Sequence, residues 1–221
     1  MELVRFIQYF TIAALVIVCL SSIIIIAKRL FKIKPLQFFT LYLIGSLVIN
    51  IPALILGKLG SNNLPLLHLF TIWEFVLVGL FYRSNTSIRC RDIYKYILIT
   101  GTVLLLVNSA FIQGMTEFNS YAKGFSQVIL LLFSIHYLFQ NSDAGDSETV
   151  ELKSTLNLIN GGLCVYFAGS LFIFMSSNFL LEMTDLLLKL FAINVILHFL
   201  FQVIVFYAVW KLAYPKIRSS P

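Results

Sequence analysis

Charge is what this sequence has least of. Only 12% of its 221 residues are Asp, Glu, Lys or Arg, against about 25% in an ordinary soluble domain, while 59% are apolar. A soluble fold of this size could not bury that much apolar surface. The composition therefore excludes a soluble enzyme and a soluble nucleic-acid-binding domain, and it indicates a protein whose solvent is lipid.

Cysteine and histidine are also scarce, with three of each. The cysteines, Cys19, Cys90 and Cys164, lie in three different segments and form no CxxC pair, so neither a disulfide framework nor a thiolate metal site is predicted. The net charge of +6 does not indicate a nucleic-acid partner, because the basic residues lie in short segments between apolar runs. No motif indicates a cofactor, and no metal site is expected.

Long apolar runs, by contrast, are abundant. Seven runs approach or exceed the roughly 20 residues that a helix needs to cross a bilayer, and none shows the alternating pattern of β-barrel strands. They are predicted at Phe6–Ala27, Leu36–Leu56, Leu64–Tyr82, Ile93–Ile112, Tyr121–Gln140, Leu156–Asn178 and Thr184–Trp210. The expected fold class is therefore all-α, a polytopic seven-transmembrane-helix bundle, with residues 1–221 forming one domain.

The distribution of Lys and Arg predicts how the bundle is oriented. Twelve of the sixteen basic residues lie on the side that holds the connections after spans one, three and five and the C-terminal segment. The other four, Arg5, Lys58, Lys123 and Lys189, lie on the opposite side. We therefore expect the N-terminus outside and the C-terminus in the cytoplasm.

Glu74 is the one acidic residue that falls inside a span rather than in a connection or at a helix end. It lies near the middle of the third span, where a charged carboxylate costs at least about 2.5–3.5 kcal/mol. Its side chain should therefore face the bundle interior and be protonated or paired. We expect it to anchor a ligand or a proton. The alternative is that a protonated Glu74 hydrogen-bonds a neighbouring helix and only holds the bundle together.

The three histidines, His68, His136 and His198, lie in spans three, five and seven. At about 1.5 Å per residue, His68 lies some 15 Å from the level of the other two, so a three-histidine metal site is not expected. Glu74 lies within about 6 Å of the level of His136 and His198. These three residues could therefore meet if their helices are neighbours.

A polar stripe marks the seventh span. Asn194, His198 and Gln202 are spaced four residues apart, which places them on one helix face. Such a stripe should face protein or water rather than lipid. In the third span, Thr71 shares a face with Glu74. Polar groups of this kind can line a ligand pocket, and they can equally form interhelical hydrogen bonds that only support the bundle.

Two segments, residues 62–74 and 193–198, resemble a pattern found in short seven-helix membrane proteins of Bacteroidota. The length and the number of spans agree with this family. The resemblance implies the inner membrane of a bacterium as the location, and it implies no particular activity.

Three functions remain open. The leading hypothesis is a sensor or receptor-like component that binds a ligand or proton inside the bundle, with a protein partner docked on the cytoplasmic segments or a second copy of the chain. The second is a secondary transporter coupled to protons. The third, and the only enzyme, is an intramembrane metal-dependent hydrolase using Glu74, His136 and His198. The candidate ligand- or proton-binding residues are Glu74, His198, Asn194, His68, Thr71, Gln202 and His136.

Overall fold

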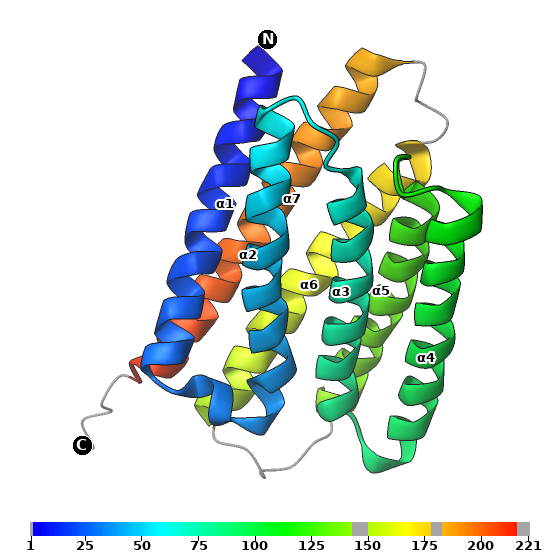
Figure 1. Ribbon diagram of the computed structural model, residues 1–221. Coiled ribbons are helices and arrows are strands. Elements are labelled where there is room, and N and C mark those ends of the chain that lie inside the picture. Colours follow the sequence, from blue (N-terminus) through cyan, green and yellow to red (C-terminus); the bar gives the residue numbers. More distant parts are fainter. Residues whose placement is uncertain (1, 143–149, 178–182, 216–221) are drawn as a thin grey trace.

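The computed structural model describes residues 2–142, 150–177 and 183–215. Its α-helices are α1 (Glu2–Ala27), α2 (Gln37–Lys58), α3 (Leu64–Ser84), α4 (Arg91–Val107), α5 (Ser120–Ser142), α6 (Val150–Ser177) and α7 (Thr184–Ala213). Within the described residues, seven helical segments are long and apolar enough to cross a membrane (Figure 1). The prediction of an all-helical chain with seven such spans is confirmed.

The predicted span boundaries agree with the helices within a few residues, except at the start of α6. Residues 150–155 are helical, although the sequence predicts an acidic connection over residues 141–151 and a sixth span that begins only at Leu156. This polar first part of α6 is attached to α7, because Lys211 Nζ donates a hydrogen bond to Ser154 Oγ at 2.8 Å. The other acidic residues of that predicted connection, at 143–149, lie outside the described residues.

Six of the helices form a ring in the order α1, α2, α3, α5, α6, α7, in which each helix packs against the next and α7 packs against α1. Helix α4 lies outside this ring and packs mainly on α3 (Figure 1). Helices α1, α3, α5 and α7 all begin at the same end of the bundle, which we call the N-terminal end. The opposite end is called the C-terminal end.

The half of the ring nearer the C-terminal end is filled. The Tyr82 hydroxyl donates a hydrogen bond of 2.8 Å to Asn160 Oδ1, and Ser134 Oγ donates one of 2.9 Å to the same oxygen. These contacts join α3, α5 and α6 across the ring. Buried aromatic rings pack around them, among them Phe81 against Phe39 and Phe133 against Tyr82. The candidate site lies in the other half of the ring, nearer the N-terminal end.

Candidate functional site

A cavity of about 470 Å³ lies in the N-terminal half of the ring. All six ring helices contribute to its wall, together with Phe118 and Asn119 just before α5. It extends from the exposed Lys58 at the end of α2 to the buried Lys123 and to His198 near the middle of α7. Most of the wall is apolar, and this part includes Leu15, Phe70, Phe118, Phe174, Phe191 and Val195.

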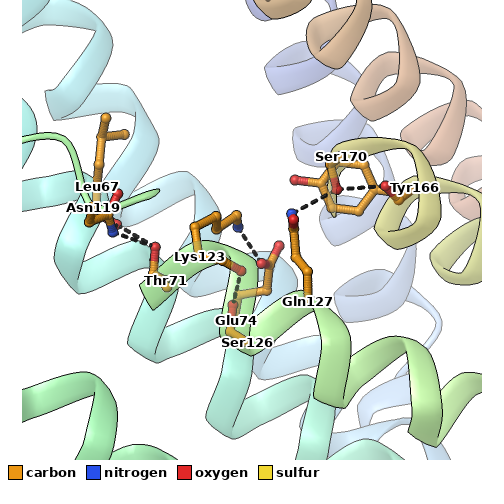
Figure 2. A network of polar contacts seen from close by, with 9 residues as sticks. All are labelled: Leu67, Thr71, Glu74, Asn119, Lys123, Ser126, Gln127, Tyr166 and Ser170. Atoms are coloured by element: carbon orange, nitrogen blue, oxygen red, sulfur yellow. Dashed lines mark hydrogen bonds and ion pairs between the residues drawn. The ribbon is translucent and has the colours of Figure 1, made fainter. Parts of the chain in front are cut away.

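An ion pair closes the cavity on the side of α3 and α5. Lys123 Nζ donates a hydrogen bond to Glu74 Oε2, and both side chains are buried, with relative exposures of 6% and 0% (Figure 2). The Lys123 ammonium also lies 5.1 Å from the ring centre of Phe70 and 5.9 Å from that of Phe174, within the range of cation–π attraction. Lys123 contributes to the cavity wall, whereas Glu74 does not. The paired carboxylate therefore lies behind the lysine, away from the cavity.

Lys123 is the functional residue that the sequence did not reveal. It was expected among the basic residues at the membrane surface, because a lysine near a helix end normally extends its ammonium group toward water. The structure shows the opposite: the side chain is buried and paired with Glu74. The sequence analysis did not predict this burial, and the acid at position 74 is the one sequence signal that a cationic partner is needed.

The connection between α4 and α5 explains how Lys123 reaches Glu74. After α4 the chain forms a π-helical turn at Asn108–Ile112 and then folds back against α3. His68 holds this segment in place, with Nδ1 2.8 Å from Ser109 Oγ and Nε2 3.1 Å from the carbonyl oxygen of Glu117. A neutral imidazole with its proton on Nε2 satisfies both contacts, because the carbonyl can only accept. Lys123 lies in the first turn of α5, directly after this segment. The position of the segment therefore places Lys123 beside Glu74.

Gln113 and Asn119 secure the beginning of α5. The Gln113 side chain donates to Ser120 Oγ at 3.0 Å and accepts from the backbone N–H of Tyr121 at 3.0 Å. Asn119 Nδ2 donates to Thr71 Oγ1 at 2.8 Å (Figure 2). Thr71, a predicted site residue, therefore has two roles, since it lines the cavity and binds the segment that carries Lys123.

Polar contacts continue from the ion pair toward α6. Gln127 Nε2 donates to Ser170 Oγ at 2.7 Å, and Ser170 Oγ donates to the carbonyl oxygen of Tyr166 at 2.6 Å (Figure 2). The Tyr42 hydroxyl lies close enough to the Glu74 carboxylate to interact with it. Among the described residues, the buried Gln127 Oε1 atom has no hydrogen-bond partner. Buried polar atoms are usually satisfied, so Gln127 Oε1 has unused capacity to accept a hydrogen bond.

The structure brings some of the predicted site residues together. Asn194 and His198 line the cavity from α7, opposite Thr71. The His198 ring packs edge-on against Tyr166, with ring centres 5.4 Å apart. The buried Asn194 Oδ1 atom has no hydrogen-bond partner in the described part of the chain. Glu74 does not line the cavity itself, but its ion-pair partner Lys123 does.

Besides Glu74, three predicted site residues do not line the cavity. His68 holds the segment before α5, as described above. His136 lies farther along α5, where Nδ1 is 2.6 Å from the Tyr94 hydroxyl and Nε2 is 3.2 Å from Gln140 Nε2. Gln202, the third member of the predicted stripe on α7, is fully buried and neither of its amide atoms has a partner among the described residues.

Glu74, His136 and His198 were the residues required by the hydrolase hypothesis. Each has a different environment: Glu74 contacts Lys123, His136 contacts Tyr94, and His198 packs on Tyr166. Within residues 2–142, 150–177 and 183–215, no three His, Cys, Asp or Glu side chains are grouped so that they could hold a metal ion. The geometry therefore gives this hypothesis no ligand set.

Replacing His68 by Leu should lower the free energy of unfolding by about 1–3 kcal/mol, because two buried polar partners lose their hydrogen bonds. Ser109→Ala removes only one of these contacts and should cost about 1 kcal/mol. Thermal unfolding in detergent measures both effects. Hydrogen exchange over residues 113–119 should be faster in His68→Leu, and unchanged exchange there would contradict the role assigned to His68.

Comparisons of the chain with protein-family models, with curated proteins and with solved structures give no match.

Proposed function

We propose that this protein is an integral membrane protein that binds a small molecule inside its helix bundle and acts as a sensor or receptor-like component. The observation that supports this most strongly is the cavity of about 470 Å³ with a buried ion pair at its wall. Ligand pockets typically measure about 300–1,000 Å³ and combine an apolar lining with a few polar groups. Here the polar groups of the wall include Asn194, His198 and Lys123.

The charge distribution supports an orientation with the cavity toward the outside. Because Lys123 is buried in the bundle, three of the basic residues that the structure describes remain at the N-terminal end, against ten at the opposite end. The excess of Lys and Arg is expected in the cytoplasm. A ligand would then enter from outside, in the inner membrane of a bacterium. A protein partner would contact the basic segments at the C-terminal end and receive the signal, or a second copy of the chain would take its place.

Cavity binding can be tested without knowing the ligand. Val195→Trp on α7 would fill the cavity, whereas Val203→Trp places the same indole at an exposed position outside the cavity wall. Native mass spectrometry of gently extracted protein should detect a bound small molecule in the wild type and in Val203→Trp. It should be lost from Val195→Trp. Equal retention in both variants, or no bound molecule in any of them, would contradict the proposal.

A secondary transporter is the second candidate. The favouring observation is that a buried acid–base pair lies between a cavity at one end of the ring and a packed aromatic layer at the other. Such a pair can take up and release protons while the substrate site changes from being open to one side of the membrane to being open to the other. Uptake into proteoliposomes should then depend on pH, and Glu74→Gln should abolish that dependence. A sensor that does not transport would show no uptake under any of these conditions.

A further inference from the structure

Among the described residues, the charged side chains of the cavity wall are lysines. Lys58 lies near its open end and Lys123 at its buried end. Along the described ranges, 2–142, 150–177 and 183–215, no Asp or Glu belongs to the wall. We propose that the ligand is an amphipathic monocarboxylate, and that its carboxylate binds the Lys123 ammonium group. This inference rests on the proposed function, because it names the chemical class of the molecule that the cavity holds.

The hydrogen bonding of Lys123 supports a second acceptor. An ammonium group has three N–H donors, and Glu74 Oε2 is the one acceptor that Lys123 Nζ contacts among the described residues. Lys123 lines the cavity, and its Nζ atom lies 5.1 Å from the ring centre of Phe70 and 5.9 Å from that of Phe174, so the described part of the chain offers no second acceptor to the other two N–H groups. A buried donor without an acceptor costs free energy. A carboxylate in the cavity can satisfy both N–H groups.

The rest of the wall defines the body of the ligand. Four aromatic rings form an apolar part of the wall: Phe70 on α3, Phe118 before α5, Phe174 on α6 and Phe191 on α7. Phe70 and Phe174 lie next to the ammonium group, and Phe118 and Phe191 pack against Phe174. They favour an alkyl chain or an aryl ring attached to the carboxylate. A metabolite that is polar throughout would leave its hydroxyl groups against these rings without partners.

Glu74 limits the affinity for such a ligand. Its carboxylate already neutralises Lys123, so a second carboxylate adds an excess negative charge to a buried site. Glu74→Gln retains the shape of the side chain and removes this competing charge. We therefore expect carboxylates to bind Glu74→Gln about tenfold tighter or more than the wild type. A purely structural role of the ion pair predicts the opposite, because the variant would then bind every ligand less well.

The test compares four probes at neutral pH with protein in lipid nanodiscs, using the shift in unfolding temperature and the dissociation constant. Decanoate, decanol and decylamine share one tail and differ in head group. The fourth probe, 4-phenylbutanoate, distinguishes a soluble aromatic acid from a lipid-derived acid. Decanoate or 4-phenylbutanoate, or both, should stabilise the wild type and should stabilise Glu74→Gln more strongly. Decanol and decylamine should not.

A double variant keeps the test valid if Glu74→Gln does not fold. Glu74→Gln combined with Lys123→Met has no buried charge at this site and should lose the preference for carboxylates over decanol. Equal binding of decanol and decanoate to the wild type, with both lost in Val195→Trp, would overturn this inference and leave the proposed function standing. Preferential binding of decylamine would overturn it as well. Failure of every probe, together with no co-purifying molecule, would overturn both.

Discussion

Glu74→Gln is expected to lower the free energy of unfolding by about 3–5 kcal/mol, because it leaves the Lys123 ammonium buried without a counter-charge. Both members of the pair are almost completely inaccessible, at 6% and 0% relative exposure. Water can reach Lys123 only from the cavity, so it compensates for the lost carboxylate less well than it would at a surface pair. Lys123→Met should cause a loss of similar size, since Glu74 then lacks its cation. Reversible unfolding in mixed detergent micelles measures both values.

The double variant Glu74→Gln/Lys123→Met should recover most of this loss. The double variant has no uncompensated buried charge, and no ions have to be removed from water when it folds. Neutral replacements of buried ion pairs are often as stable as the pair itself. Because two single losses of about 3–5 kcal/mol each then leave only a small loss in the double variant, the double-mutant cycle should give a coupling energy of about 5 kcal/mol or more. Two single losses that simply add in the double variant would show that the two charges do not interact in the folded protein.

Gly45→Ala should destabilise the bundle by about 1–3 kcal/mol through overpacking. A Cβ atom at this position of α2 would overlap the indole ring of Trp73 on α3. The overlap is with atoms of the rigid indole ring, so it cannot be relieved by a small change at the end of a flexible chain. Helices α2 and α3 would instead have to separate. The unfolding temperature of the purified variant reports this effect.

Gly161→Ala on α6 is the matched control. A Cβ atom there meets no atom within 4 Å, and alanine is a better helix former than glycine by about 1 kcal/mol. We therefore expect this variant to be as stable as the wild type or slightly more stable. Equal destabilisation by the two substitutions would show that glycine is needed in these helices for flexibility and not for the close contact with Trp73.

The number and the extent of the helices could be predicted from the sequence because both depend on local composition. A run of about 20 apolar residues can satisfy its backbone hydrogen bonds in lipid only as a helix. This reasoning located all seven helices and failed only at the start of α6, where residues 150–155 are polar and form helix through contacts with α7. Glu74 could be identified in the same way, since it is the one acid inside an apolar run.

The environment of each site residue depended on tertiary structure. Asn194 and His198 line the cavity, whereas Gln202, on the same predicted stripe, does not. A period of four residues places side chains on one face, but it does not determine how much of that face a neighbouring helix covers. For the same reason, His68 could not be recognised as the residue that holds the segment before α5.

The sequence by itself therefore determined that the chain forms seven apolar helices and that Glu74 needs a partner or a proton inside them. Only the tertiary structure decided that the partner is Lys123. The π-helical turn and the folded-back connection after α4 set where α5 begins, and thereby place a residue near the start of one helix beside the middle of another. Such relative shifts of helices along their axes arise from contacts between residues far apart in the chain. They therefore cannot be predicted from the periodicity within any one helix.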